Sequence, residues 1–286
     1  MKTILVTGCA GYIGGTFTYK ALADGFRIIG LDNFSNSDKS KIERLALEFP
    51  SSFIFRRIDL YKDSNKIRRL FADFSIDLVV HFAALKSVPE SEKYKKKYYE
   101  NNVLGTQNLV SSLQNKQTSG IIFSSSAAIY GNQSRFPISE KSKPNPISHY
   151  AKTKLECEEI IKDATKSLTI KAISLRYFNP LGVHKKKIFF ENIHEDQRSV
   201  LANILRNYLN YESEFNIFGN SFPTKDGTGI RDYIHIDDLV DGHFKAISHL
   251  DMIKEYEVFN LGTNKGVSVN ELVQTFNDLV ETPIKP

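Results

Sequence analysis

The sequence is poor in cysteine and has no long apolar run. Its two cysteines, Cys9 and Cys157, lie far apart and fit neither a disulfide framework nor a zinc-ligand spacing, so we expect no metal site. No uninterrupted apolar stretch approaches the roughly 20 residues that a membrane-spanning helix needs. The N-terminus begins directly with a strand pattern and shows no signal-peptide pattern. We therefore expect a cytoplasmic protein without a membrane partner.

Clustered charge is also scarce. The 286 residues include 38 Lys and Arg against 33 Asp and Glu, a formal net charge of +5 that is spread along the chain. The short basic runs 95–97 and 185–187 are interpreted as solvated faces. A nucleic-acid-binding protein usually shows a stronger, clustered excess and a matching motif. We expect no nucleic-acid partner.

The pattern of the chain is that of an α/β protein. Short β-branched and aromatic runs alternate with longer amphipathic ones, which is typical of βα units that form a doubly wound parallel sheet, the Rossmann fold. Strands are predicted at 2–7, 26–31, 52–58, 77–82, 120–125 and 170–177. Helices are predicted near 12–24, 38–48, 63–73, 94–115, 149–166, 197–210, 236–250 and 268–280.

The alternation breaks at NPLG, near residue 178. We predict a dinucleotide-binding Rossmann domain over 1–178 and a smaller, mixed α/β, mainly substrate-binding region over 179–286. Some segments, such as 232–262, are expected to return to the first domain. Apolar residues left over on the two longest helices, 94–115 and 149–166, could pair with a second subunit, so a homodimer is expected.

A glycine-rich turn, GCAGYIGG, follows the first strand. Gly8, Gly11 and Gly14 are three residues apart and precede a helix. In a βαβ unit such glycines permit the turn, let the backbone approach a pyrophosphate and let the helix pack on the sheet. Taken alone, the triplet fits a phosphate-binding turn or a structural corner equally well.

An acidic residue at the end of the second strand favours the nucleotide interpretation. Asp32 follows Leu31 and precedes Asn33, where a carboxylate can accept both ribose hydroxyls of an adenosine and repel a 2′-phosphate. The alternative is a turn residue, since Asp-Asn is also turn chemistry. The combination with the glycine turn predicts NAD rather than NADP as the cofactor.

A candidate proton-transfer set follows the fifth strand. Tyr150 and Lys154 are four residues apart at the start of a long helix and so share one face, behind the hydroxyls of residues 124–126. A phenol has a pKa near 10, and a neighbouring ammonium group favours the phenolate, which can remove a proton from a substrate hydroxyl. An ordinary exposed helical pair is the alternative for this spacing alone.

Nine blocks of the sequence follow one another in the order of a known family, from residue 1 to about 270. They are VTGCAGYIGG, LDNFSNS, IDLVVHFAALKSV, YYENNVLGT, IIFSSSAAIYG, SHYAKTKLECE, LRYFNPLG, IFGNSFPTKDGTGIRDYIHIDDLVDGH and YEVFNLGTNKGVSV. Through these blocks the chain resembles the extended short-chain dehydrogenase/reductases, and within them the UDP-glucose 4-epimerase family.

The resemblance implies an activity and a set of site residues. The activity is NAD-dependent epimerisation at C4 of a UDP-hexose through a transient 4-keto sugar, an isomerase reaction of galactose metabolism. The implied catalytic residues are Ser126, Tyr150 and Lys154. The implied NAD contacts are Gly8, Gly11, Tyr12, Ile13, Gly14, Asp32, Asn33, Asn36, Ser37, Asp59, Leu60, Phe82, Ala83, Ala84, Lys86, Asn101, Ser124, Tyr150, Lys154, Tyr177 and Phe178. The implied UDP-sugar contacts are Lys86, Ser126, Tyr150, Asn179, Ser199, Val200, Asn216, Phe218, Arg231 and Tyr233.

Two features depart from the family pattern. The chain ends at Pro286, before the block that supplies another diphosphate-binding arginine in the family. Ser199 and Val200 stand at the positions of an asparagine and of a leucine that touches the uracil. The sequence therefore leaves open a protein that binds NAD without turnover.

Two related reactions on nucleotide sugars, dehydration and decarboxylation, fit the sequence to different degrees. Dehydration is disfavoured, because Ala127 and Ala128 replace the acidic pair of the dehydratase branch. Decarboxylation of a UDP-uronic acid also begins with C4 oxidation and stays an alternative, as does another reaction on a nucleotide sugar.

Overall fold

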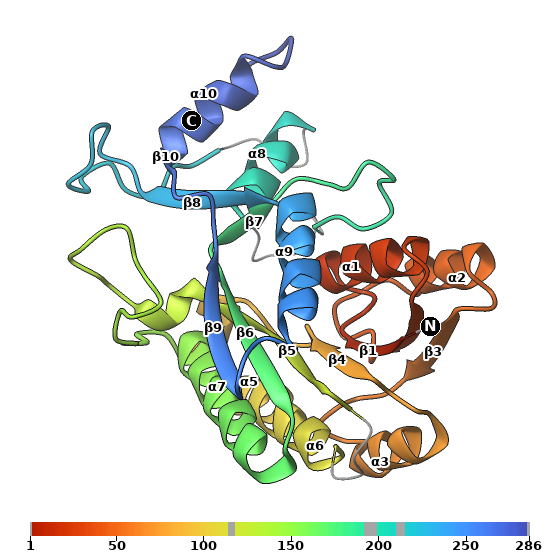
Figure 1. The fold of residues 1–286 in the computed structure, drawn as a ribbon. Helices are drawn as coiled ribbons and strands as arrows, with labels where there is room; N and C mark the ends of the chain where they lie inside the picture. Colours follow the sequence, from red (N-terminus) through yellow and green to blue (C-terminus); the bar gives the residue numbers. More distant parts are fainter. Residues whose placement is uncertain (1, 114–117, 192–198, 210–214, 285–286) are drawn as a thin grey trace.

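A seven-stranded sheet forms the centre of the molecule (Figure 1). The structure is a computed structural model that describes residues 2–113, 118–191, 199–209 and 215–284. Every neighbouring strand pair in this sheet is parallel, in the order β3-β2-β1-β4-β5-β6-β9. The strands are β1 (Thr3–Thr7), β2 (Arg27–Asp32), β3 (Phe53–Arg57), β4 (Leu78–His81), β5 (Gly120–Ser126), β6 (Lys171–Tyr177) and β9 (Tyr256–Leu261). The predicted Rossmann-type fold and its first six strands are confirmed.

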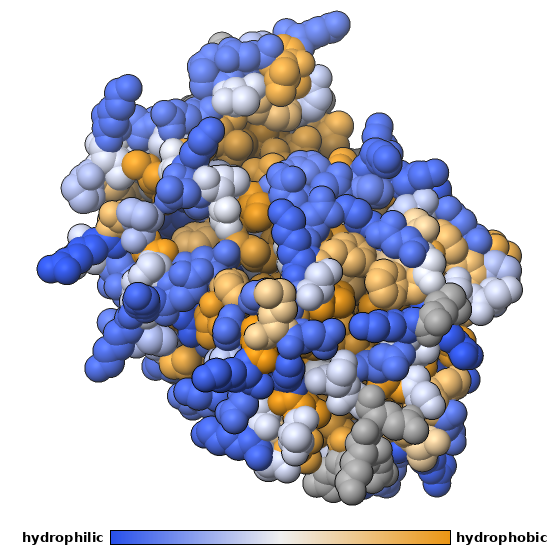
Figure 2. Space-filling model, in the orientation of Figure 1, coloured by the Kyte–Doolittle hydropathy of each residue, from blue (hydrophilic) through white to orange (hydrophobic). Residues whose placement is uncertain are grey.

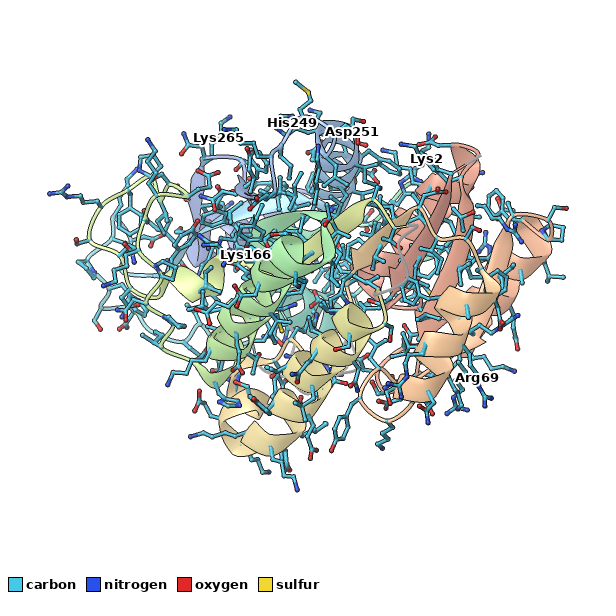
Figure 3. The ribbon with its side chains drawn as sticks, turned by 60° about the horizontal axis from the view of Figure 1, so that its bottom comes forward. Lys2, Arg69, Lys166, His249, Asp251 and Lys265 are labelled. Carbon is cyan, nitrogen blue, oxygen red and sulfur yellow. The ribbon has the colours of Figure 1, made fainter. Side chains whose placement is uncertain are left out.

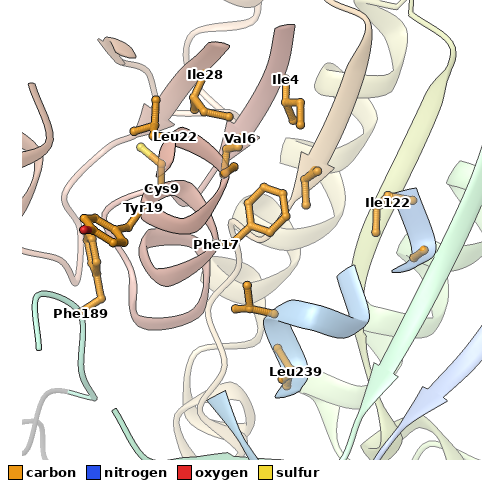
Figure 4. Packing of buried hydrophobic residues seen from close by; sticks show 14 of the residues in the cluster. Ile4, Val6, Cys9, Phe17, Tyr19, Leu22, Ile28, Ile122, Phe189 and Leu239 are labelled. Carbon is orange, nitrogen blue, oxygen red and sulfur yellow. The ribbon is translucent and has the colours of Figure 1, made fainter. Parts of the chain in front are cut away.

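Helices cover both faces of this sheet. One face carries α1 (Tyr12–Ala23), α2 (Lys39–Glu48) and α9 (Ile236–His249), and the other carries α3 (Ser64–Asp73), α6 (Gly105–Ser111) and α7 (His149–Leu168). Alternation along β1 explains the division, because Ile4 and Val6 join the first core cluster while Leu5 joins the second. Figure 4 shows Phe17 of α1 and Leu239 of α9 within the first cluster.

A smaller three-stranded sheet lies beyond the carboxyl ends of the large one (Figure 1). It contains β7 (Asn179–Leu181), β8 (Ile230–His235) and β10 (Gly266–Ser268), with β8 parallel to β7 and antiparallel to β10. Two helices, α8 (Val200–Tyr208) and α10 (Val269–Asn277), share a small core of their own. Between β8 and β10 the chain returns to the large sheet through α9 and β9.

The prediction of one continuous helix over 94–115 is wrong, because the region consists of several helical segments. The helical region begins earlier, with α4 (Val88–Lys93), and Tyr94 takes a non-helical conformation after it. It then continues as α5 (Lys95–Tyr98), the π-helical turn η1 (Tyr99–Leu104) and α6. A buried side chain from this turn, Asn102, bonds to the backbone of Leu85 and to Thr153, so tertiary contacts override helical periodicity here.

Other helix ends agree with the sequence to within a few residues. Ser268 caps α10 with a complete capping box, in which Glu271 bonds back to the Ser268 N–H. Residues 114–115 of the predicted helix 94–115, and 197–198 and 210 of the helix 197–210, lie outside the described residues.

Charged side chains lie mostly at the periphery. Lys2, Arg69 and Asp251 are exposed and project away from the ribbon (Figure 3). Within the described residues, no helix is both long enough and apolar enough to cross a bilayer. The same part of the chain holds no cluster of three metal-ligating side chains.

Two leucines of α2 provide a matched test of this packing. Leu45 is 0% exposed and Leu47 is 83% exposed. We expect Leu45→Ala to lower the free energy of unfolding by about 2–5 kcal/mol, because it removes buried methyl groups and leaves a cavity. Leu47→Ala should change it by less than about 0.5 kcal/mol. Urea unfolding measures both, and equal effects would contradict the helix orientation described above.

Candidate active site

A large cleft lies between the carboxyl ends of the central strands and the smaller sheet. Its volume is about 2470 Å³, and its walls include residues from β1, β2, β5, β6, β7 and β8. Figure 2 shows a recessed, largely apolar zone near the centre of the face, bordered by hydrophilic side chains. The strand order reverses direction between β1 and β4, which is where open α/β sheets bind their ligands.

The glycine turn forms one end of this cleft. Gly8 has a φ of +71°, which favours glycine, and a Cβ there would lie 2.8 Å from the Ala83 nitrogen. A Cβ on Gly14 would lie 2.3 Å from the Gly8 carbonyl oxygen. Gly11 is the N-cap of α1 and offers no side chain to the first-turn N–H groups. The turn thus leaves a positively polarised helix N-terminus facing the cleft.

Asp32 holds the loop that follows β2. One carboxylate oxygen accepts from the Ala10 N–H at 3.0 Å, and the other accepts from the Phe34 N–H and the Ser37 hydroxyl, each at 2.8 Å. Asn33 donates to Asp59 at 3.0 Å. The carboxylate therefore lies beside the glycine turn, as its predicted contact with an adenosine requires.

Tyr150 and Lys154 lie at the other end, where β5 ends. The Lys154 ammonium donates to the Ser124 carbonyl at 2.7 Å and lies 4.8 Å from the centre of the Phe123 ring. Burial lowers the pKa of Lys154 to about 8. Burial raises the pKa of Tyr150 to about 12, and a hydrogen bond with Ser126 opposes that shift. These side chains are buried, which contradicts the alternative of an ordinary exposed pair.

The other side of the cleft is more open. Arg231 is exposed and donates to the Ile230 carbonyl at 2.7 Å. Within the described residues it makes no ion pair, and it pairs with neither Asp226 nor Asp232. The Tyr233 hydroxyl is buried and has no hydrogen-bond partner in that part of the chain. Phe218 is 86% exposed. Side chains on this wall are therefore available to a ligand.

One ion pair and a hydrogen bond join the two sides of the cleft near α1. The Tyr12 hydroxyl donates to the Gly182 carbonyl at 2.6 Å, which ties α1 to the segment after β7. Lys86 pairs with Glu191 at 3.0 Å, and Ser199 also donates to this carboxylate while it caps α8. The two sides of the cleft are thus joined at this end.

Nearly all of the site residues predicted from the sequence line this one cleft. The exceptions are Asp59 and Asn216. Asp59 lies between the lining residues Ile58 and Leu60 and accepts a hydrogen bond from Asn33, which lines the cleft. Asn216 is exposed outside the lining, so nothing in the geometry supports its predicted contact.

Known proteins agree with this arrangement. The sequence pattern of the NAD dependent epimerase/dehydratase family matches residues 4–262. The chain belongs to this family. Two similar relatives are UDP-glucose 4-epimerase 2 of Arabidopsis thaliana (38% identical over 280 residues, 96% of this chain and 80% of the relative) and the UDP-glucose 4-epimerase of Erwinia amylovora (39% over 276 residues, 96% and 82%).

A solved structure extends the similarity to three dimensions. It is the UDP-glucose-4-epimerase of Stenotrophomonas maltophila with bound NAD and formylated UDP-arabinopyranose. It superposes with a TM-score of 0.90 at 35% identity, over 97% of this chain and 82% of that one. The resemblance to UDP-glucose 4-epimerases predicted from the motifs is confirmed.

One buried residue of this epimerase/dehydratase family member was missed by the sequence analysis. His243 on α9 accepts a hydrogen bond from the Tyr177 hydroxyl through Nε2, because its Nδ1–H donates to the Leu239 carbonyl at 2.9 Å. Burial lowers the pKa of His243 to about 4, so the ring is neutral. Helical spacing from Leu239 places His243 on the buried face, but no sequence signal joins it to Tyr177, 66 residues away.

The glycine turn yields a test that needs no turnover. Gly14→Ala places a methyl group against the backbone carbonyl of Gly8, so the turn must open. The amount of NAD bound per mole of purified protein should fall by about tenfold or more, as a loss of about 1.4 kcal/mol of binding free energy gives. Gly229→Ala is the control, because its nearest contact would be an ordinary 3.7 Å. NAD released by acid and measured by chromatography gives the result. Unchanged NAD content in Gly14→Ala would contradict the assignment of this turn.

Proposed function

We propose that this protein epimerises C4 of a UDP-hexose, interconverting UDP-galactose and UDP-glucose, with NAD as its cofactor. The observation that carries the proposal is the burial of Tyr150 and Lys154 beside Ser126, in the same cleft as the glycine turn. The cleft volume of about 2470 Å³ exceeds the roughly 300–1,000 Å³ of an ordinary ligand pocket. It therefore has room for a dinucleotide and a nucleotide sugar together.

The residues present fit NAD. Gly8, Gly11 and Gly14, with Tyr12 and Ile13, would hold the pyrophosphate at the N-terminus of α1. The Asp32 carboxylate would accept from the adenosine ribose, helped by the loop that it organises. Bound NAD supplies a reversible acceptor for the hydride of the sugar C4. The nicotinamide end would be held by Phe82, Ala83, Ala84, Lys86, Asn101, Ser124, Tyr177 and Phe178, and the adenosine end by Asp32, Asn33, Asn36, Ser37, Asp59 and Leu60.

Tyr150 is the residue that transfers the proton in this proposal. Its phenolate removes the proton from the sugar 4-hydroxyl and returns it after the sugar has turned. The Lys154 ammonium favours this phenolate, which burial alone disfavours. Ser126 orients the substrate oxygen. Because the proton is returned, the reaction needs no proton path to solvent.

The open wall would anchor the UDP. The exposed Arg231 guanidinium suits a diphosphate, and Asn179 and the Tyr233 hydroxyl, which has no partner among the described residues, lie on the same side. Ser199, Val200 and Phe218 would contact the uridine end. For Asn216 the same contact is supported only by the resemblance to the family. Fixing the UDP while leaving the hexose few partners lets the sugar turn between hydride transfers.

Dehydration fits the site less well. Ala127 and Ala128 line the cleft directly after Ser126 and carry no acidic group for the elimination of water. This observation favours epimerisation within the family.

A coupled assay tests the proposal. Purified protein is given UDP-galactose without added NAD, the reaction is stopped by heat, and the UDP-glucose formed is then measured in a second step with UDP-glucose dehydrogenase and NAD. We expect product formation that falls roughly 10²- to 10⁴-fold in Tyr150→Phe, since that change removes the general base.

Tyr99→Phe is the matched control and should keep the wild-type rate, because Tyr99 is exposed and lies outside the cleft lining. Folded protein that carries NAD but forms no UDP-glucose would refute the epimerase proposal. That outcome would favour a protein that binds NAD without turnover, or one that acts on another nucleotide sugar such as a UDP-uronate.

We also infer the cellular compartment, the oligomeric state and the domain organisation of the protein. We place the protein in the cytoplasm as a homodimer, with 1–178 as the NAD-binding domain and 179–286 as mainly the substrate-binding region. Exposed Tyr94, between α4 and α5, offers apolar surface to a second subunit. Sedimentation of the purified protein at micromolar concentration should give a mass near twice 32.5 kDa, and a monomer would contradict this inference.

A further inference from the structure

A third functional group continues the line of Tyr150 and Lys154 along α7. Glu158 follows Lys154 by four residues, so the three side chains lie on one face of the helix. Glu158 and its partner Arg176 on β6 form an ion pair with a distance of 2.7 Å. Only 4% and 6% of their side chains are exposed. Neither group lines the cleft, so the pair does not contact a ligand directly.

The geometry of this pair is bidentate. The Arg176 Nε donates to one carboxylate oxygen of Glu158 at 3.0 Å, and its Nη2 donates to the other. Two parallel hydrogen bonds fix the relative orientation of the two groups, unlike a single contact between flexible chains. The pair therefore fixes α7 against β6.

Further hydrogen bonds extend the pair to the strand that ends in the proposed catalytic serine. The Ser125 hydroxyl donates to the Glu158 carboxylate. Ser125 lies between Ser124, whose carbonyl accepts from Lys154, and Ser126, which hydrogen-bonds to Tyr150. One carboxylate on α7 thus bonds both to the end of β5 and to β6.

The far end of the network reaches the remaining neighbours of the site. Arg176 donates to the Tyr130 hydroxyl at 3.0 Å, and Tyr130 donates to Asn260 of β9 at 2.7 Å. Tyr130 belongs to η2 (Ala127–Tyr130), the turn that Ser126 caps. The elements that carry the proton-transfer residues therefore meet at the Glu158–Arg176 pair.

We propose that the buried Glu158–Arg176 pair positions the proton-transfer site by holding α7 and the end of β5 in the register that brings Tyr150 to Ser126 and Lys154 to Ser124. The proposal deepens the proposed function and rests on it. Glu158 and Arg176 act through these residues and are positioning residues, since neither reaches the reacting atoms.

Electrostatics give the pair a second effect on the same site. Burial lowers the pKa of Lys154, while the charge of the Glu158 carboxylate raises it. Burial alone would lower the pKa of Arg176, but the hydrogen bonds and charge of Glu158 raise it above its ordinary value. The other titratable groups facing this cluster are Tyr150 and Cys157 on α7, His81 on β4, Tyr130 on η2, Tyr177 on β6 and Tyr256 on β9.

The sign of the pH effect follows from these charges. The Glu158 carboxylate favours the protonated form of Lys154, so its neutralisation lets Lys154 lose its proton at lower pH. Above that pH the Tyr150 phenolate lacks its cation. The alkaline decline of kcat should therefore begin earlier in Glu158→Gln than in the wild type.

The first experiment compares Glu158→Gln with Glu159→Gln. Both remove one negative charge from α7, but Glu159 is exposed. In Glu158→Gln we expect kcat for UDP-galactose to fall roughly 10- to 100-fold, KM to change less than about threefold, and the alkaline limb to move down by about one pH unit. Glu159→Gln should match the wild type. A loss of stability with an unmoved alkaline limb would overturn the proposal.

A milder variant guards against misfolding. Ser125→Ala keeps the ion pair and removes only its link to β5, so kcat should fall roughly 3- to 10-fold with the NAD content and the KM retained. Wild-type kcat in folded Ser125→Ala would overturn the positioning role.

A measurement without turnover separates this proposal from the proposed function. In protein carrying ¹³C-labelled lysine, the signal of Lys154, assigned with Lys154→Met, reports the pH at which this group titrates. We expect titration near pH 8 in the wild type and lower in Glu158→Gln. The same pH in both proteins would overturn the inference, whether or not the wild type epimerises UDP-galactose.

Discussion

The structure depends on one ammonium group that must keep its charge although it is buried out of contact with water. Lys154 is buried at the carboxyl end of the sheet, where the cost of desolvation lowers its pKa to about 8. The Ser124 carbonyl, the face of Phe123 and the Glu158 carboxylate offset that cost. Because these partners come from α7 and β5, the charge can persist only while helix and strand keep their register. The same condition places Tyr150 beside Ser126.

Topology explains why this charge faces a cleft. The chain adds strands on one side of β1 and then on the other, so loops diverge between β1 and β4 and leave a crevice at their carboxyl ends. The glycine turn after β1 and the serines after β5 therefore line one opening although more than 100 residues separate them. The small sheet closes this opening from above through β7 and β8, which continue directly from β6 and into α9. One chain path thus builds both walls.

The sequence predicted most of the large sheet because its strands are buried and strongly apolar. β9 was missed because it is an edge strand, and Glu257 and Asn260 interrupt its apolar pattern. The strands β7 and β10 have three residues each, too few for any periodicity to appear. Most residues that line the cleft end of the sheet could be predicted from local motifs such as GCAGYIGG and YAKTK. Contacts between distant segments, such as Tyr177 with His243 or Glu158 with Arg176, leave no local pattern and required the structure.

The two walls of the cleft differ in a way that suits a reaction in which the substrate must turn. On the sheet side, Tyr150, Lys154 and Tyr177 are buried and hydrogen-bonded, so their positions are fixed before any ligand arrives. On the other side Arg231 and Phe218 are exposed, so they can adjust to the shape of a ligand. A proton must be removed and returned at one point for both epimers, which requires a rigid base. The hexose must present either face to the cofactor, which requires few fixed contacts around its ring. Rigidity at Tyr150, the proposed base, and freedom on the opposite wall are therefore two requirements of the proposed mechanism, and the fold meets them by building the first from the large sheet and the second from the small one.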